Sequence, residues 1–186
     1  NYLIVVGEFN QSLVLLNTGT LTNEGTITNE LTFTNTGTLT NEGTITNTNE
    51  GTITNNNLLT VIGTISNLGS IINNDVINID SGGLIYNNVG EDGTITNNVN
   101  GIIRINSATI LENSLNYFYN YGTVLNGDET HRGNIEVYNN AIFDNFKGST
   151  FVNYPLSTLY LEGGFSNAGT FTNKGEVISL FAFVNE

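Results

Sequence analysis

The sequence predicts an all-β protein built as a single parallel β-solenoid. The strongest observation is a repeat: the eleven residues Gly19–Asn29, GTLTNEGTITN, recur letter for letter at Gly37–Asn47. Inside that block the six-residue word G-T-[LI]-T-N-x appears twice. Short repeats of fixed period are typical of stacked structural units in which each unit contacts its neighbours. The composition agrees, because roughly one residue in five is Asn, and Asn, Gly and Thr are all weak helix formers.

The hexads predict the sides of a three-sided coil of about 18 residues, because three sets of three hexads follow one another. The sets are Gly19–Glu24, Gly25–Glu30 and Leu31–Thr36; Gly37–Glu42, Gly43–Glu50 (two residues longer, at a corner) and Gly51–Asn56; and Asn57–Ile62, Gly63–Leu68 and Gly69–Asn74. A hexad is too short to bury an apolar face alone, so coil must stack on coil at about 4.8 Å. At about 20 residues per coil, the chain is expected to form about nine coils.

The period of six keeps the alternation of side chains in phase from one hexad to the next, since six is even. If Leu21 points inward, then the other mid-hexad aliphatic residues, the Gly and the Asn do so too, and the Thr pairs point outward. Gly allows close backbone approach, and Asn tolerates corners and stacks into amide ladders along the axis. The predicted structural ladder is Gly19, Leu21, Asn23, Gly25, Ile27, Asn29, Gly37, Leu39, Asn41, Gly43, Ile45 and Asn47.

The chain changes character near residue 106, where the hexads blur and aromatic residues become frequent. We therefore divide it into a regular hexad-repeat solenoid, residues 1–106, and a less regular, aromatic-rich continuation with a terminal strand, residues 107–186. The continuation is expected to consist of wider coils with larger inward side chains; a small separate β-domain is the alternative. The apolar ends, Tyr2–Val6 and Val177–Val184, are either capping strands or edges that continue into another subunit or further chain.

Runs such as NTGTLTNEGTITN and GTFTNKG resemble the G-x-[LI]-x-N-x-G-x-[LI] repeats of filamentous-haemagglutinin-type and autotransporter-type surface proteins. The resemblance covers Asn17–Asn74 well and the rest in pieces. It implies a right-handed parallel β-helix at the surface of a cell or virion. The alternative is the left-handed hexapeptide helix, whose coil also has 18 residues. That family places a small or acidic residue directly after the aliphatic one, where this chain has Thr, so the right-handed form is favoured.

Charge excludes several classes of partner. The chain has 17 acidic and 4 basic residues, a net charge of −13, and the basic residues are scattered singly. Binding to nucleic acid requires clustered Lys and Arg, so no nucleic-acid partner is expected. No apolar run approaches the roughly 20 residues of a membrane span, so no membrane insertion is expected. The chain has no Cys, which excludes thiolate metal sites, and no Met. The missing Met predicts a processed chain or a piece of a longer one.

Candidate catalytic and metal-binding residues are few, and we expect no enzyme. His131, the only His, lies in Gly127–Gly133, but the adjacent Asp128 and Glu129 would point apart on a strand. A solvated loop is the favoured interpretation, and a tailspike-like polysaccharide-acting β-helix is an alternative. No cofactor is expected; Ca²⁺ needs six to eight oxygen ligands and is the one metal considered. Its weak candidate ligands are Asp75, Asp80, Asp92 and Asp128.

The outward Thr pairs form the candidate contact face, represented by Thr20, Thr22, Thr38 and Thr40. Regular T-x-T arrays form ice-binding faces in some β-solenoid antifreeze proteins. Here the pairs occupy all three sides of the coil, which favours a role in strand propensity and solubility instead.

The sequence therefore favours a non-enzymatic structural surface or fibre protein, outside the cell, that stacks head to tail with itself. An adhesin that binds a surface glycan, or an ice-binding module, is the alternative.

Overall fold

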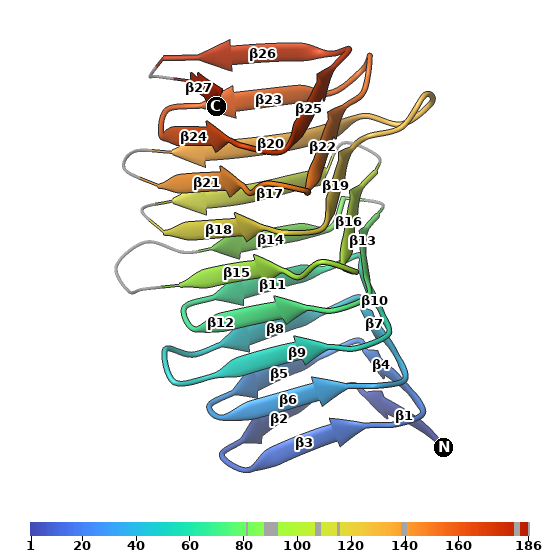
Figure 1. The fold of residues 1–186 in the computed structure, drawn as a ribbon. Helices are drawn as coiled ribbons and strands as arrows, with labels where there is room; N and C mark the ends of the chain where they lie inside the picture. Colours follow the sequence, from blue (N-terminus) through green and yellow to red (C-terminus); the bar gives the residue numbers. More distant parts are fainter. Residues whose placement is uncertain are drawn as a thin grey trace.

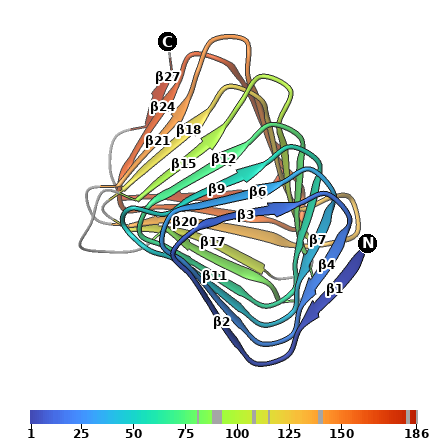
Figure 2. The same cartoon turned by 90° about the horizontal axis from the view of Figure 1, so that it is seen from below.

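The computed structural model describes residues 1–80, 82–87, 93–106, 109–114 (backbone only), 116–138, 141–180 and 183–185. In these ranges every regular element is a β-strand, and the strands pair in parallel. They form three sheets of nine strands, and successive strands enter successive sheets (Figures 1 and 2). The fold is the predicted parallel β-solenoid.

The three sheets are the three sides of the coil seen end-on in Figure 2. The first contains β1 (Tyr2–Val5), β4 (Thr20–Asn23), β7 (Thr38–Asn41), β10 (Leu58–Val61), β13 (Val76–Ile79), β16 (Ile102–Ile105), β19 (Thr123–Asn126), β22 (Thr150–Asn153) and β25 (Thr170–Asn173). The second contains β2 (Glu8–Gln11), β5 (Thr26–Asn29), β8 (Thr44–Asn47), β11 (Thr64–Asn67), β14 (Leu84–Asn87), β17 (Thr109–Ser114), β20 (Gly133–Tyr138), β23 (Thr158–Leu161) and β26 (Glu176–Ser179). The third contains β3 (Val14–Asn17), β6 (Thr32–Asn35), β9 (Thr52–Asn55), β12 (Ser70–Asn73), β15 (Thr94–Asn97), β18 (Tyr117–Asn120), β21 (Ile142–Asn145), β24 (Gly164–Asn167) and β27 (Phe183–Asn185).

The coil is right-handed in both views. In Figure 2, seen from the N-terminal end, β1, β2 and β3 follow one another clockwise while the chain recedes from the viewer. In Figure 1 the strands of the third sheet run from left to right at the front as the chain climbs. The right-handed coil agrees with the sequence prediction, which was based on the Thr that follows each aliphatic residue of the hexad.

Like residues stack on like residues, as the repeat predicts. Leu21 pairs with Leu39, and Ile27 pairs with Ile45. From β4 to β16, burial alternates along each strand, with the second and fourth residues buried. The second residue fills the apolar core, and Ile27, Leu39 and Ile45 have no exposed surface. Each short strand thus buries its apolar face only because the coils above and below cover it.

Phenylalanine fills the core of the later coils. In the third sheet the Phe118 and Phe143 rings stack at 4.3 Å, and the column continues through Phe165 to Phe183. Inward aromatic residues agree with the expectation for this part of the chain. The tyrosines do not: Tyr117, for example, pairs with Thr94 on the outer side of its sheet. Parity explains the difference, because Phe118 and Phe143 occupy Leu/Ile positions of the hexad, whereas Tyr117 and Tyr119 occupy Thr positions.

Candidate functional site

The most continuous feature of the interior is an Asn ladder along the third sheet. The last residue of each of its nine strands is Asn, and each Nδ2 donates to the Oδ1 of the Asn in the next coil at 2.6–2.9 Å. Each rung has further bonds: Asn17 Nδ2, for example, also donates to the carbonyl of Thr38 at 2.9 Å. The members are Asn17, Asn35, Asn55, Asn73, Asn97, Asn120, Asn145, Asn167 and Asn185. Amide stacking along the axis is therefore confirmed, and it spans the structure from the first coil to the last.

The ladders of the other two sheets are interrupted by apolar residues. In the second sheet the ladder runs from Gln11 through Asn29, Asn47 and Asn67 to Asn87. In the first sheet Asn23 bonds to Asn41, and a separate segment begins at Asn126. Among the described residues, the Oδ1 atoms of Asn23 and Asn126 are buried without a hydrogen-bond partner.

These orphaned oxygens have a simple cause. Asn23 stands above Val5, and Asn126 stands above Ile105, so in both places the coil below supplies no amide donor. Because every rung donates toward the C-terminal end, an apolar residue below a ladder leaves an acceptor unpaired. The two unpaired oxygens therefore lie at the N-terminal start of each ladder segment, as the donation toward the C-terminal end requires.

Glycine in the predicted ladder is required by close backbone contact. A Cβ on Gly37 would collide with the carbonyl oxygen of Gly19, and a Cβ on Gly43 would collide with that of Gly25. The same atoms carry the inter-coil bonds: Thr38 N donates to Gly19 O at 2.8 Å, one residue after Gly37. Gly19 and Gly25 face Asn1 and Gly7 of the first coil in the same way. These positions therefore set the separation of the coils at the corners.

The candidate contact residues Thr20, Thr22, Thr38 and Thr40 are half-buried on the outer side of the first sheet. Thr20 pairs with Thr38, and Thr22 pairs with Thr40. The same arrangement occurs on the other two sheets, for instance at Thr26/Thr28 and Thr32/Thr34. The structure does not gather the Thr pairs onto one face.

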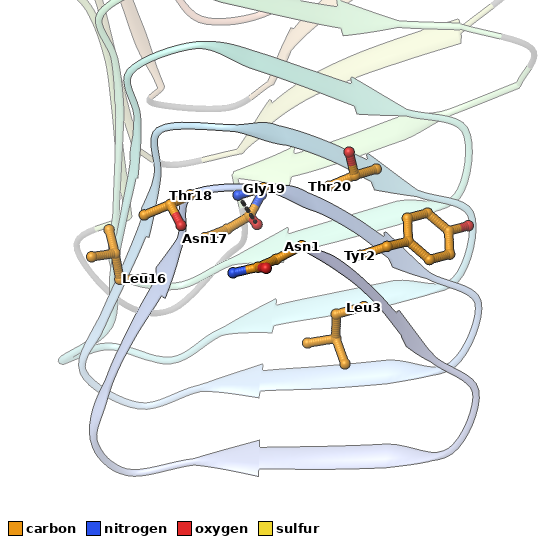
Figure 3. A pocket seen from close by; sticks show the side chains of 8 residues that line it. All are labelled: Asn1, Tyr2, Leu3, Leu16, Asn17, Thr18, Gly19 and Thr20. Carbon is orange, nitrogen blue, oxygen red and sulfur yellow. Dashed lines mark hydrogen bonds between the residues drawn. The ribbon is translucent and has the colours of Figure 1, made fainter.

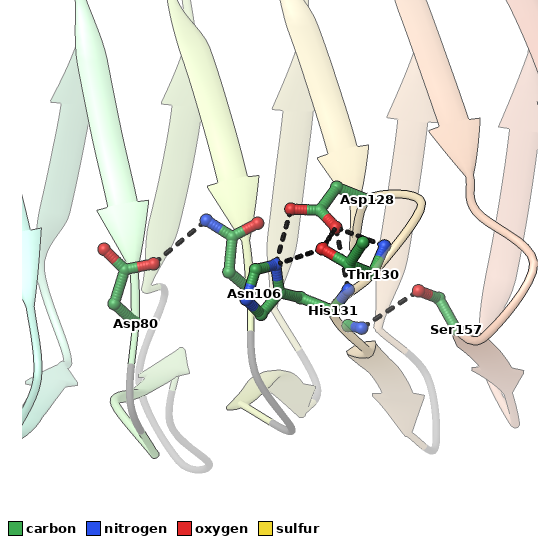
Figure 4. Close-up of polar contacts among 7 residues, drawn as sticks. Asp80, Asn106, Asp128, Thr130, His131 and Ser157 are labelled. Atoms are coloured by element: carbon green, nitrogen blue, oxygen red, sulfur yellow. Dashed lines mark hydrogen bonds and ion pairs between the residues drawn. The ribbon is translucent and has the colours of Figure 1, made fainter.

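The proposed metal ligands do not come together. Asp80 Oδ1 accepts a bond from Asn106 Nδ2 at 2.9 Å, and Asp128 is bonded within its own loop (Figure 4). Asp75 lies at another corner, where its carbonyl accepts a bond from Asn73, and Asp92 lies outside the described residues. Among the described residues, no group of three His, Cys, Asp or Glu side chains is close enough to hold a metal ion.

The loop between β19 and β20 places Asp128 beside the only histidine. Asp128 Oδ2 lies 2.7 Å from His131 Nδ1, while Oδ1 accepts bonds from the Thr130 and His131 backbone N–H groups at 2.6 and 2.7 Å (Figure 4). The Thr130 N–H, followed by the His131 side chain, holds the pKa of Asp128 well below its usual range. The Asp128 and His131 side chains are both about half exposed, and Glu129 instead pairs with Lys174 at 3.3 Å. The carboxylate therefore organises a surface loop.

An outer cluster of tyrosines and carboxylates was not predicted. On the second sheet, Tyr138 and Tyr160 lie 5.6 Å apart between ring centres, and their hydroxyls donate to Glu136 and Glu162. The bond to Glu162 raises the pKa of Tyr160. On the third sheet, Tyr117 and Tyr119 stack at 5.6 Å. Continuing the alternation of inward and outward side chains from the regular hexads to residue 160 would have predicted that these tyrosines point outward.

Within the described residues, the first and last coils have a neighbouring coil on one side only. Leu3 and Phe9 occupy inward positions of the first coil but are 50% and 40% exposed, because no coil lies below them. Two hollows lie on this coil, one of about 150 Å³ beside Tyr2 and Leu3 (Figure 3) and one of about 270 Å³ between Phe9 and Leu15. At the other end Phe183 is 37% exposed. The described residues include no helix with the length and apolarity of a membrane span.

No protein-family model matches the chain, and no curated protein matches it. Among solved structures, the chain is similar to the crystal structure of a TibC-catalysed hyper-glycosylated fragment of TibA. The identity is 14%, the match covers 99% of each chain, and the TM-score is 0.22. At this score the similarity carries no argument; the sheet topology alone shows the β-solenoid.

Proposed function

We propose that the chain is a non-enzymatic structural segment of an extracellular rod or fibre on the surface of a cell or virion. The observation that carries the proposal is the unbroken Asn ladder of the third sheet. It joins every coil to the next with buried, charge-free hydrogen bonds, which resist bending and local opening more than apolar contacts alone. The remaining side chains of the repeat serve the same stacking.

The dimensions define the kind of structural role. Nine strands per sheet, stacked at about 4.8 Å, make a prism roughly 40 Å long. A prism of this length is a building block, and it becomes a rod by joining further coils at its ends. The acidic surface, with a net charge of −13, keeps such rods apart side by side.

Small-angle X-ray scattering and negative-stain electron microscopy of the purified chain test this role. We expect rigid particles of constant cross-section, together with no response in a glycan array, a polysaccharide cleavage assay and a thermal-hysteresis assay. A flexible particle, or a strong response in any of the three assays, would remove the structural proposal.

A glycan-binding, adhesin-like role is the second candidate, and the outer Tyr–Glu cluster favours it. Aromatic rings with adjacent carboxylates are suited to sugar hydroxyls, and Tyr138, Tyr160 and Glu136 provide both. The same groups already bond to one another, which is why we rank this role second. Binding on a glycan array that is lost in Tyr160→Ser and kept in Thr158→Ser would reverse the ranking.

A further inference from the structure

We propose that two copies of this chain pair side by side, with their first sheets face to face and their long axes antiparallel. The two-fold axis of the pair passes between β13 and β16, in the middle of the sheet. The inference goes beyond the proposed rod segment, because it names a partner for one side of the rod: a second copy of the same chain.

The distribution of charge singles out the first sheet. Its nine strands contain no Asp or Glu, and Arg104 is their one charged residue. The strands of the second sheet contain four Glu, and those of the third contain Asp144. In a chain with a net charge of −13, two copies repel each other wherever carboxylates meet. The first sheet is therefore the side on which two copies can approach closely, and the acidic remainder of the surface limits association to a pair.

A stripe of apolar side chains runs along the outer face of this sheet through five consecutive coils. The first residues of β10, β13 and β16 are Leu58, Val76 and Ile102, and each pairs with the next. The stripe continues through Leu125 and Val152, the third residues of β19 and β22. All five are half-buried on the outer side of their strands. Parallel strands with apolar residues on both faces are typical of sheets that are covered on both sides.

The stripe selects the antiparallel orientation. If the two axes were parallel, each coil would face its own copy with the strand reversed, so Ile102 would face Arg104. In the antiparallel pair, β13 faces β16 and the first residues of the facing strands meet. Val76 then faces Ile102 twice, and Arg104 faces Asn78 twice. Apolar side chains therefore meet at the centre of the pair, and the strands of the two sheets stay aligned, as in packed sheets.

The corner at the end of these strands fixes the position of the two-fold axis. An axis through β13 would bring Asp80 against Asp80, and an axis through β16 would bring Arg104 against Arg104. An axis between the two strands avoids both repulsions and places Glu24 opposite Lys174. Each corner residue donates its backbone N–H to the strand below, and the column consists of Glu24, Glu42, Ile62, Asp80, Asn106, Gly127, Tyr154 and Lys174.

Arg104 provides the polar contact near the centre of the pair. Its Nη1 lies 3.5 Å from Asn78 Oδ1 in the coil below, so the guanidinium leans toward the level of the two-fold axis. In the pair it faces the other copy's Asn78, which lies two residues before Asp80. Asp80 Oδ1 accepts a bond from Asn106 Nδ2 (Figure 4), and Oδ2 is then the acceptor for the guanidinium. The symmetry gives two such charge-assisted contacts.

The area of the face is sufficient for a reversible pair. Eight coils face one another, from β4 to β25, and their first-sheet strands have four residues each. At about 3.3 Å per residue and about 4.8 Å per coil, the face covers roughly 500 Å² in each copy, or roughly 1,000 Å² in the pair. Specific interfaces begin at about this size, so we expect a weak, concentration-dependent dimer.

The first experiment is sedimentation velocity of the full 186-residue chain at a series of concentrations. Arg104→Glu and Asp80→Arg are each expected to raise the dissociation constant of the pair about tenfold or more, because each creates two like-charge contacts. The double variant restores the contacts and should return close to the wild-type value. Net charge alone predicts opposite effects for the two single variants, since one adds negative charge and the other removes it. Opposite effects, or no recovery in the double variant, would overturn the proposal.

A second comparison tests the apolar stripe. Ile102→Glu should abolish the pair, since it places two carboxylates at its centre. Ile72→Glu is the matched control, because Ile72 is a half-buried outward residue of β12 in the third sheet, and it should leave the pair intact. Circular dichroism checks that both variants fold. Equal effects of the two substitutions would show that the first sheet is not the interface.

The orientation is tested by cross-linking, which the absence of Cys makes selective. Thr38 of β7 faces Thr150 of β22 in the antiparallel pair. A short bis-maleimide should therefore join Thr38→Cys to Thr150→Cys in a mixture of the two variants, and cross-linking of Thr38→Cys to itself would contradict this orientation. If the wild-type chain remains a single rigid prism at every concentration, the pairing is wrong and the structural role stands. Flexible particles would instead defeat the structural role itself.

Discussion

At the scale of the residue, each hexad position is constrained by the residue one coil below it. Asn23, Gly25 and Ile27 differ in chemistry, yet each is stacked on its counterpart in a neighbouring coil. A single substitution therefore changes the packing between two neighbouring coils. The change in the free energy of unfolding depends on whether a coil covers that residue.

Gly37→Ala is expected to destabilise the chain strongly, by about 2 kcal/mol or more, because the new Cβ meets the backbone of Gly19, which has no flexible side chain to move aside. Gly7→Ala is the matched control, since nothing lies within 4 Å of the corresponding Cβ. Urea unfolding followed by circular dichroism measures both. Equal midpoints for the two variants would contradict the steric explanation.

The loop at Asp128 is expected to loosen in acid. Its pKa is lower in the folded chain than the ordinary value of 3.8, so the carboxylate stabilises the loop at pH values above 3.8. That contribution is lost as the pH falls below 3.8 through the folded value. Amide hydrogen exchange at Thr130 and His131 should therefore accelerate in this range, and Asp128→Asn should show fast exchange already at neutral pH. Unchanged exchange in the variant would show that the carboxylate does not hold the loop.

At the scale of the element, each strand is four residues of a ladder that runs along the whole sheet. β15 illustrates this arrangement: Thr96 faces outward, and Asn97 links Asn73 below to Asn120 above. The strand has too few residues to be stable alone. Its buried polar end must therefore be satisfied by other coils.

Asn97→Leu is expected to lower the free energy of unfolding by about 2–4 kcal/mol, since it leaves both neighbouring amides without one partner in a buried site. Thr96→Val, at the adjacent half-buried position on the outer side, should change it by less than about 1 kcal/mol. Denaturant unfolding of both variants tests the difference. A larger loss in Thr96→Val would contradict the importance of the ladder.

Val5→Asn is expected to stabilise the chain by about 1 kcal/mol, because its Nδ2 would reach the buried, unpaired Oδ1 of Asn23. Val5→Thr, which changes polarity without supplying an amide, is the comparison. A rise in the thermal midpoint for the Asn variant alone is the expected outcome. A fall in both would show that Asn23 Oδ1 is satisfied in another way.

At the scale of the whole molecule, the coils form one stack in which every interior coil has two neighbours and the end coils have one. Local opening is easiest where neighbours are missing. Under conditions in which the chain is monomeric, amide hydrogen exchange should be slowest in β9–β16 and faster in β1–β3 and β25–β27. Uniform exchange along the chain would contradict this gradient.

The repeat determined the fold class, which side chains point inward, and the role of each hexad position. A period of six keeps the alternation of a strand in phase and allows coils to stack, whatever the surroundings. It placed Leu21 and Asn23 on the inner face without knowledge of the structure, and both are buried. The outward Tyr138 and Tyr160 were missed because the hexads blur there and the register was not carried through.

The sequence by itself therefore determined the local facts: which side chains alternate, which residues stack, and that Asn lines the corners. Only the tertiary structure decided which ladder is unbroken and which oxygens are buried without a partner. The physical reason is that period and parity are properties of a few adjacent residues. Continuity along a sheet depends on which residues meet across gaps of 18 to 27 positions, and the lengths of the intervening corners set those gaps.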